Sequence, residues 1–309
     1  MEKIRIFQKG FNYSQDGQGN RLVYHLQGCN MKCPWCANPE GMKMEGALYL
    51  DKDWIQDELC PKGAVKEKVL DRSICAKCDG MECQTVKYKN KGLRLSFEEY
   101  TTDEIFDEIL RSSPMFYDGG GVTFTGGEAT MQFDALKELL IRLTKAGVHT
   151  VIETNGANPR LPELFPYIDQ LIMDCKHLDA KKHMTYTGVP FDVVDRNLKH
   201  AAEVHKHLDI RIPFIGGVND SEEDMEMFAR YLKELAGENV TVEILKYHEF
   251  GKNKWEACGM NYQMTEKAHV TIEQIQYFHH IPAESLLPET ILPNDSALSL
   301  PEIFFSQDP

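Results

Sequence analysis

The sequence predicts an α/β protein whose main body is a partial (β/α)6 barrel interrupted by a small inserted module. From about residue 119 onward, apolar runs of strand length alternate with helical patterns. Strands that alternate with helices form parallel sheets through right-handed crossovers. Six such strands are too few for the closed barrel of eight strands, but they fit an open one. A cysteine-rich segment at about residues 51–94 breaks the alternation.

The expected elements follow from these periodicities. The six strands are predicted at residues 22–27, 122–125, 150–153, 170–174, 210–213 and 240–245. The clearest helices are predicted at residues 102–110, 133–146 and 221–235. Ser221 is a typical N-cap residue, and the carboxylates of the next residues, Glu222, Glu223 and Asp224, interact favourably with the positive end of a helix dipole.

The composition divides the chain into three parts. Residues 51–94 hold four cysteines, three glycines and many lysines but few large apolar residues, so we interpret them as a module held by metal rather than by a core. The barrel is then discontinuous, at residues 1–50 and 95–281. Residues 282–309 contain no Lys or Arg and four prolines before the terminal one, and we expect an irregular tail there.

The charge balance excludes some classes of partner. With 34 Lys and Arg against 48 Asp and Glu, the 309 residues carry a formal charge of −14, which disfavours binding of nucleic acid over the whole surface. There is no apolar run of about 18 residues, so no membrane span is expected. The N-terminal residues show no apolar signal-peptide segment, and we therefore expect a cytoplasmic protein.

Nine cysteines are the main chemical signal, and seven of them are clustered. Cys29, Cys33 and Cys36 have the spacing C-x3-C-x2-C. Three thiolates on one loop can bind three irons of a four-iron cluster and leave the fourth iron open for chemistry. A zinc site is the alternative, but it would need a fourth ligand, and the nearby His25 is on the preceding strand. Cys175 and Cys258 are interpreted as packing residues.

Residues 28–40, with the sequence GCNMKCPWCANPE, resemble the signature of radical S-adenosylmethionine enzymes. The resemblance is closest to the glycyl radical enzyme activating enzymes, and it continues in consistent order from about residue 5 to 280. The further matching segments are GGGVTFTGGEA at 119–129, ETNG at 153–156, DCK at 174–176, RIP at 211–213, GVND at 217–220, YH at 247–248 and GKNKW at 251–255.

The resemblance implies a TIM-like partial barrel that binds S-adenosylmethionine beside a [4Fe-4S] cluster on Cys29, Cys33 and Cys36. It assigns Gly126, Gly127 and Glu128 to the aminium group, where glycine also allows close approach of the backbone. It places Trp35 and Asn38 at the adenosyl group, and His248 and Lys176 at the methionine carboxylate. Thr154, Asn155, Asp174 and Arg211 complete the implied contacts.

The predicted strand at 170–174 offers a physical reason for part of this set. Alternation along residues 171–176 puts Ile172, Asp174 and Lys176 on one face, and an adjacent carboxylate and ammonium suit a zwitterionic methionine. A structural salt bridge is the alternative. The resemblance also implies a monovalent cation site formed by Glu153, Thr154, Asp174 and the Ile172 carbonyl, although Glu153 stands where the family often has Asp.

The second cysteine group departs from the family pattern. Many relatives carry a ferredoxin-like insert with two cysteine runs and two clusters, in which the fourth Cys of each run binds the other cluster. Here Cys60-Pro61 lacks its three upstream partners, whereas Cys75, Cys78 and Cys83 remain. We therefore expect one auxiliary [4Fe-4S] cluster held by Cys60, Cys75, Cys78 and Cys83. A zinc ribbon with these four ligands is the alternative.

The insert is also locally basic. Between Lys62 and Arg94, nine basic residues face four acidic ones, a balance of +5 in a chain of −14. A solvated lysine-rich face is one reading. Our hypothesis is that this island docks an acidic electron donor, a reduced flavodoxin or ferredoxin, which the rest of the surface would repel.

The resemblance implies an anaerobic activase as the function. Such an enzyme reductively cleaves S-adenosylmethionine to methionine and a 5′-deoxyadenosyl radical, which abstracts a hydrogen atom from a glycine of a partner glycyl radical enzyme. Two alternatives are retained: a radical S-adenosylmethionine enzyme acting on a small molecule, and a noncatalytic iron-sulfur electron carrier or zinc-binding module.

Overall fold

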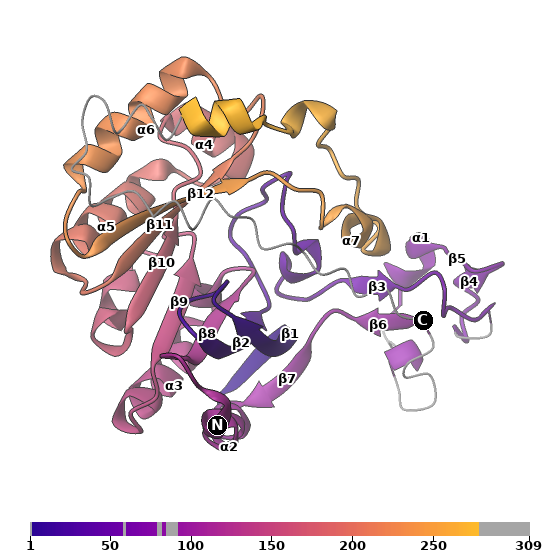
Figure 1. Ribbon diagram of the computed structural model, residues 1–309. Helices are drawn as coiled ribbons and strands as arrows, with labels where there is room; N and C mark the ends of the chain where they lie inside the picture. The colour runs from indigo at the N-terminus through magenta and orange to yellow at the C-terminus, as the bar shows by residue number, and fades with distance from the viewer. Residues whose placement is uncertain (1, 58–59, 79–81, 85–91, 278–309) are drawn as a thin grey trace.

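The computed structural model describes residues 2–57, 60–78, 82–84 and 92–277 (Figure 1). Residues 282–309, for which an irregular tail is predicted, lie outside this range. Within it, no helix is long and apolar enough to cross a membrane.

An eight-stranded sheet forms the body of the protein. Its strand order is β12 (Val240–Lys246), β11 (Leu208–Phe214), β10 (Gln170–Asp174), β9 (Thr150–Thr154), β8 (Gly121–Gly126), β2 (Asn20–Leu26), β1 (Lys3–Tyr13) and β7 (Glu98–Thr101). The six strands from β12 to β2 are parallel, which confirms the six predicted strands. The sequence did not indicate β1 and β7, which add an antiparallel edge beside β2.

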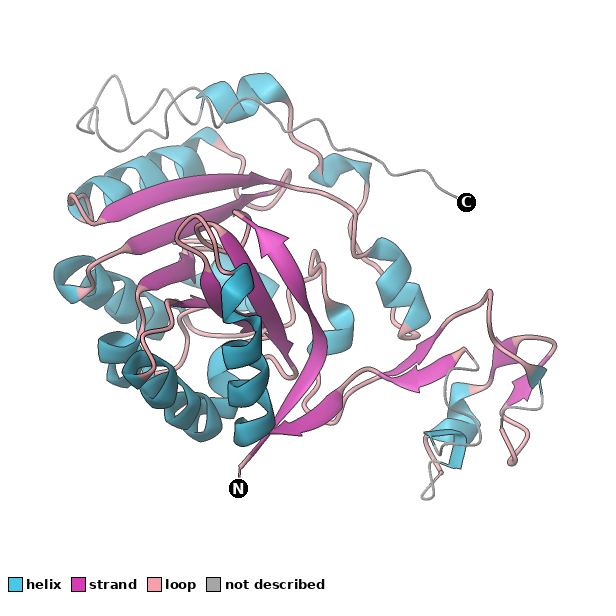
Figure 2. Cartoon of the chain, turned by 60° about the horizontal axis from the view of Figure 1, so that its bottom comes forward, coloured by secondary structure: helices cyan, strands magenta, loops and turns pink. Residues whose placement is uncertain are grey.

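The helices that follow the parallel strands lie together on one side of the sheet (Figures 1 and 2). The α-helices are α1 (Arg72–Cys75), α2 (Thr102–Ser112), α3 (Phe133–Lys145), α4 (Ala180–Thr187), α5 (Phe191–Val204), α6 (Glu222–Glu234) and α7 (Lys252–Ala257). The predicted positions of α2, α3 and α6 are confirmed, and Ser221 caps α6 by accepting a hydrogen bond from the Asp224 N–H at 3.2 Å. Short 3-10 helices are η1 (Pro39–Gly41), η3 (Glu82–Gln84), η4 (Ser113–Met115), η5 (Ala129–Gln132), η6 (Leu161–Tyr167) and η7 (Glu266–Ala268).

The cysteine-rich segment has little regular structure among its described residues. Two small antiparallel pairs occur, β3 (Leu48–Leu50) with β6 (Leu93–Leu95), and β4 (Val65–Lys66) with β5 (Val69–Leu70). Leu50, Ile55, Val65 and Leu93 form a separate small apolar cluster, against which Cys60 and Cys83 pack. The large core lies between the sheet and its helices. So small an apolar cluster supplies little burial free energy, and segments of this kind are usually stabilised by metal or disulfides.

A buried arginine holds the amino-terminal end of the parallel strands together. Arg21 on β2 is fully buried, and its Nε donates to Thr123 Oγ1 at 2.8 Å. Its two Nη groups donate to the carbonyls of Gln18 and Val122 at 2.9 and 2.8 Å. The guanidinium thus links β8 to the loop that joins β1 and β2. No pattern in the sequence indicates this role of Arg21.

Replacing this guanidinium tests its contribution to the fold. We expect Arg21→Met to lower the free energy of unfolding by about 2 to 4 kcal/mol, because the buried hydrogen bonds of the guanidinium to Thr123 Oγ1 and to the Val122 carbonyl would be lost. Urea denaturation would measure the loss. Arg230→Met is the control, since the side chain of Arg230 is 61% exposed and its surface ion pair contributes little. Equal stability of the two variants would contradict the assignment.

Candidate active site

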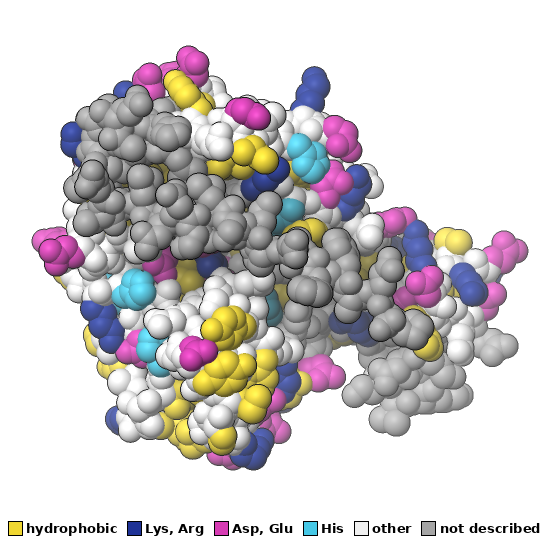
Figure 3. All heavy atoms as spheres, viewed as in Figure 1, with side chains coloured by type: hydrophobic (Ala, Val, Ile, Leu, Met, Phe, Trp, Pro, Cys, Tyr) yellow, Lys and Arg dark blue, Asp and Glu magenta, His cyan; other side chains and the backbone are white. Residues whose placement is uncertain are grey.

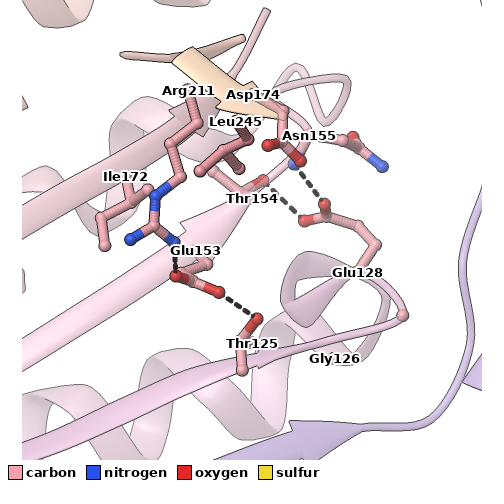
Figure 4. Close-up of a pocket in the computed structure, with 11 residues that line it drawn as sticks. Thr125, Gly126, Glu128, Glu153, Thr154, Asn155, Ile172, Asp174, Arg211 and Leu245 are labelled. Carbon is pink, nitrogen blue, oxygen red and sulfur yellow. Dashed lines mark hydrogen bonds and ion pairs between the residues drawn. The ribbon is translucent and has the colours of Figure 1, made fainter. Parts of the chain in front are cut away.

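A cavity of about 180 Å³ opens at the carboxyl ends of the parallel strands. Carboxyl ends of adjacent parallel strands meet at one edge, where α/β proteins place their ligands. Its lining residues come from strands β8 to β12 and the loops after β8 and β9, and Figure 4 shows the Arg211 and Glu153 side chains directed at one another. The lining residues are Thr125, Gly126, Gly127, Glu128, Glu153, Thr154, Asn155, Ile172, Asp174, Arg211 and Leu245. Nearly all of them were predicted; Thr125 and Leu245 were missed.

Glu128 joins the ends of β8 and β9. Its side chain is buried, and its carboxylate accepts hydrogen bonds from Thr130 N and Oγ1 at 3.0 and 2.5 Å, from Thr154 Oγ1 at 2.7 Å and from Asn155 N at 2.7 Å (Figure 4). Burial raises the pKa of this carboxyl group, while the hydrogen bonds favour its ionised form. In the structure Glu128 therefore uses its oxygens to position neighbouring segments.

The two glycines before Glu128 are required by packing. Gly126 has φ +121°, and a Cβ there would lie 2.3 Å from Leu26 N. A Cβ on Gly127 would lie 2.3 Å from the carbonyl oxygen of Gly28. The close approach is therefore to β2 and to the start of the three-cysteine loop, whose Gly28 carbonyl accepts a hydrogen bond from Glu128 N at 2.7 Å.

Arg211 and Glu153 form a partly buried ion pair in the cavity (Figure 4). Glu153 also accepts from Thr125 Oγ1 at 2.6 Å, and Arg211 also pairs with Glu243 at 2.7 Å. Burial raises the pKa of Glu153 against the effect of Arg211. For Arg211 burial acts against the charged form, but Glu153 and Glu243 raise its pKa, so the guanidinium stays charged.

Asp174 and Lys176 lie side by side, as the strand alternation indicated. Lys176 Nζ and Asp174 Oδ2 are 2.8 Å apart, and the Lys176 side chain is only 14% exposed. Burial disfavours its ammonium form, but Asp174 and the nearby Cys33 thiol raise the pKa of Lys176. This places a fixed positive charge between the cavity and the three-cysteine loop.

The three cysteines lie on a loop whose two ends are held together. Gly28 N and Cys29 N donate to the carbonyls of Gly41 and Met42, both at 2.8 Å. Burial raises the pKa of all three thiols, that of Cys36 to about 12. A buried thiolate therefore needs a compensating cation, and a metal centre supplies one.

The sulfur atoms already receive hydrogen bonds. Met31 N donates to Cys29 Sγ at 3.3 Å, and Asn38 N donates to Cys36 Sγ at 3.4 Å. N–H groups directed at sulfur stabilise thiolates bound to an iron-sulfur cluster. In the described part of the chain, no three His, Cys, Asp or Glu side chains converge as they would around a single metal ion. The cysteines that hold a four-iron cluster bind different irons and need not converge on one point, so this finding does not bear against a cluster.

Asn155 connects the cavity to this loop. Its Nδ2 donates to Asn30 Oδ1 at 2.7 Å and approaches Cys29 Sγ at 3.8 Å. Since its backbone N–H binds Glu128, Asn155 links the β8 and β9 ends to the first cysteine.

Trp35, Asn38 and His248 do not line the cavity. The Trp35 ring lies 5.8 Å from that of Tyr186, and Asn38 Oδ1 accepts from Lys254 Nζ at 2.8 Å. His248 stacks on Phe250 with ring centroids 4.3 Å apart, and burial lowers the pKa of its imidazole. The structure thus gives the predicted site two parts: the cavity at the strand ends, and the surroundings of the three-cysteine loop.

The four cysteines of the insert are also neighbours. All four are partly buried, and the other three thiols each disfavour the thiolate of Cys75, whose pKa is raised mainly by burial. Cys78 N donates to Cys75 O at 3.0 Å, so these two lie on one turn. Gln84 Nε2 donates to Cys83 Sγ at 3.3 Å. The four thiols therefore lie in one region of the insert, although residues 79–81, between Cys78 and Cys83, lie outside the described residues.

Sequence reasoning missed two kinds of site residue. Thr125 could have been found from alternation, because β8 turns Thr123 and Thr125 to the same face. Lys254 and Trp255 fall in a recognised motif, but the sequence does not show that they contact the three-cysteine loop, where Trp255 Nε1 donates to Cys36 O at 2.9 Å.

Comparison with known proteins agrees with this geometry. Residues 23–232 match the family model of the Radical SAM superfamily. The 4-hydroxyphenylacetate decarboxylase activating enzyme of Clostridioides difficile is 32% identical over 281 residues, which cover 84% of this chain and 88% of that protein. The choline trimethylamine-lyase activating enzyme of Oleidesulfovibrio alaskensis is 32% identical, over 80% of this chain and 84% of that protein.

A solved structure shows the same fold. The radical SAM methyltransferase from Sphaerobacter thermophilus superposes with a TM-score of 0.50 at 12% identity, over 89% of this chain and 66% of that one. The chain therefore belongs to the radical SAM superfamily and, within it, to the family of glycyl radical enzyme activating enzymes.

Proposed function

We propose that this enzyme installs a glycyl radical in a partner enzyme, using S-adenosylmethionine bound between the cavity and the three-cysteine loop. The observation that carries the proposal is the placement of one buried and two partly buried thiols, with N–H groups directed at two of their sulfurs, beside a cavity of charged and polar residues. When bound, a [4Fe-4S] cluster supplies the electron that splits S-adenosylmethionine into methionine and a 5′-deoxyadenosyl radical, and this radical takes a hydrogen atom from the glycine Cα.

The chain's own residues hold and orient the reactants. Cys29, Cys33 and Cys36 are the proposed cluster ligands. The Asp174 carboxylate and the Lys176 ammonium offer complementary charges to a methionine zwitterion. A volume of about 180 Å³ is smaller than the roughly 300 to 1,000 Å³ of sites that enclose a whole ligand. This supports a division in which the cavity takes the methionine end, and Trp35 and Asn38 border the adenosyl group outside it.

The remaining residues predicted to contact S-adenosylmethionine fall into two groups, those that line the cavity and those that lie outside it. His248 is proposed at the methionine carboxylate, and Gly126, Gly127, Glu128, Thr154 and Asn155 as the wall that shapes the cavity. Arg211 and Glu153 neutralise one another there. The predicted monovalent cation site fits less well, because one of its two carboxylates, that of Glu153, is already paired with Arg211, and we give the cation no role.

The domain organisation suits a macromolecular substrate. We propose that residues 1–50 and 95–281 form a partial barrel, which leaves the strand ends accessible to a glycine loop of the partner. Residues 51–94 are proposed as a ferredoxin-like insert with one auxiliary [4Fe-4S] cluster on Cys60, Cys75, Cys78 and Cys83. Support for the insert comes from the proximity of its four thiols.

The function is tested by following both products of the reaction. The reconstituted enzyme, incubated without oxygen with dithionite and S-adenosylmethionine, is expected to release 5′-deoxyadenosine. Adding the matching glycyl radical enzyme should produce a doublet in the electron paramagnetic resonance spectrum, and a partner with its radical glycine changed to alanine should not. If no 5′-deoxyadenosine formed, the proposed function would be wrong and a noncatalytic electron carrier would be favoured. Deoxyadenosine coupled only to consumption of a small molecule would favour the other alternative.

The two cysteine groups are separable by metal analysis. We expect the triple variant Cys29→Ala, Cys33→Ala, Cys36→Ala to keep about four irons per chain and to lose cleavage of S-adenosylmethionine, because the auxiliary ligands are independent. Cys175→Ala, a change at a fully buried cysteine in the core, should keep the iron content of the unmodified enzyme. Zinc without residual iron in the triple variant would overturn the auxiliary assignment.

The basic island gives a test of the electron donor. Lys62, Lys66 and Lys68 are exposed, whereas Lys87, Lys89 and Lys91 lie outside the described residues. Figure 3 shows Lys and Arg side chains interspersed with acidic ones over the insert. If the island docks flavodoxin or ferredoxin, reduction should slow several-fold as salt rises and as Lys62, Lys66 and Lys68 are changed to Gln. Matched changes at Lys145, Lys199 and Lys233 on the barrel helices should have little effect. A rate independent of salt would contradict docking by charge.

A further inference from the structure

Helix α7 lies between the insert and the three-cysteine loop (Figure 1). On the insert side, the guanidinium of Arg72, at the start of α1, donates to the carbonyls of Leu48 and Ala257 at 2.8 and 2.7 Å. Arg72 thus fastens the helix that carries Cys75 to the end of α7.

On its other side, α7 contacts the backbone at the third cysteine. Trp255 is buried, and its Nε1 donates to Cys36 O at 2.9 Å. A Cβ on Gly251, the residue before α7, would lie only 2.6 Å from Cys36 O and 2.7 Å from Ala37 Cα. The start of the helix therefore packs directly on the cysteine segment, with no room for a larger residue.

Lys254 makes the most specific of these contacts. Its Nζ lies 2.8 Å from Asn38 Oδ1 and 2.8 Å from Glu40 Oε1. The Glu40 side chain is 6% exposed, and its other carboxylate oxygen has no partner among the described residues. Because an ammonium group can only donate, the bond to Lys254 fixes which end of the Asn38 amide is which. Nδ2 is left as the group with which Asn38 can donate to another molecule.

We propose that Lys254 is a positioning residue that turns the Nδ2 donor of Asn38 toward the adenosyl group, whose ring nitrogens accept hydrogen bonds. The inference rests on the proposed function, since it requires S-adenosylmethionine beside the three-cysteine loop. It adds a residue from a short helix 216 positions along the chain from Asn38. Helix α7 also holds the Cys36 backbone through Trp255. The same helix would therefore position both a contact to the ligand and a ligand of the cluster.

A purely structural role must be separated from this one. Lys254→Met alone would leave the Glu40 carboxylate buried without a counterion, and an unpaired buried charge strongly destabilises a fold. A loss of binding in this single variant could therefore reflect damage to the fold alone. The informative variant is therefore Lys254→Met combined with Glu40→Gln, which removes both charges together. If Lys254 served only to neutralise Glu40, this double variant would behave like the unmodified enzyme.

The experiment measures the dissociation constant of S-adenosylmethionine for the anaerobically reconstituted holoenzyme by equilibrium dialysis, with iron content and thermal unfolding in parallel. We expect the double variant to keep its iron and to bind about tenfold more weakly, the effect of losing one oriented hydrogen bond. Lys252→Met is the matched control, because this half-exposed neighbour on α7 pairs with Glu249 rather than with Asn38 or Glu40, so the variant should bind S-adenosylmethionine normally.

A double-mutant cycle with Asn38→Ala assigns the effect. Asn38→Ala should weaken binding to a similar extent, and adding it to the double variant should cause no further loss, because both changes remove one interaction. The inference about Lys254 would be overturned if the double variant bound S-adenosylmethionine with unchanged affinity. It would also be overturned if the fold losses in affinity of the double variant and of Asn38→Ala multiplied when the changes were combined. Neither result would affect the proposed function. Failure of the unmodified holoenzyme to bind S-adenosylmethionine would instead overturn the proposed function on which the inference rests.

Discussion

The buried carboxylate of Glu128 is the interaction on which the site depends. Removing a carboxylate from water is costly unless its oxygens are fully hydrogen-bonded. Glu128 meets that condition with two hydroxyl and two backbone donors, from Thr130, Thr154 and Asn155. Thr130 belongs to η5, and Thr154 and Asn155 lie at the end of β9, so the charge can be accommodated only when the segment after β8 and the end of β9 are in place. Asn155 then carries the constraint to Asn30 and the first cysteine.

The other charges of the site are arranged in opposed pairs. Arg211 lies against Glu153, and Lys176 lies against Asp174. Where charges are partly removed from water, such pairing offsets part of the cost of burying them and holds the side chains in place. The formal charge of −14 therefore says little about the cavity, where Glu153 and Asp174 each face a basic group and the carboxylate of Glu128 is satisfied by hydrogen bonds. A ligand that carries both charges, as an amino acid does, can be received without a net change in the field of the site.

How much the sequence predicts depends on the range of the interaction. The six parallel strands and helices α2, α3 and α6 follow from periodicity, which is local. Strand β1 was missed because charged and amide side chains interrupt its apolar residues. Its strand conformation is stabilised by pairing with β2 and β7, which the sequence of β1 alone does not indicate. Motif resemblance found most cavity residues but not their partners. The bonds from Thr154 and Asn155 to Glu128, from Arg21 to the Val122 carbonyl and from Lys254 to Asn38 join distant positions. Pairings of this kind cannot be recognised in a single sequence.

The glycines of the TGGE segment show how a motif can be recognised for one reason and required for another. A pair of glycines at a strand end suggests a backbone that a ligand must approach. In this fold the atoms that exclude a Cβ at Gly126 and Gly127 belong to Leu26 and Gly28, in the strand and loop that lead into the first cysteine. A side chain at either position would separate β8 from the three-cysteine loop before any ligand arrived. The segment therefore sets the distance between the cavity and the cysteines, and Glu128 after it fixes their orientation, so the ligand meets a site whose two parts are already joined.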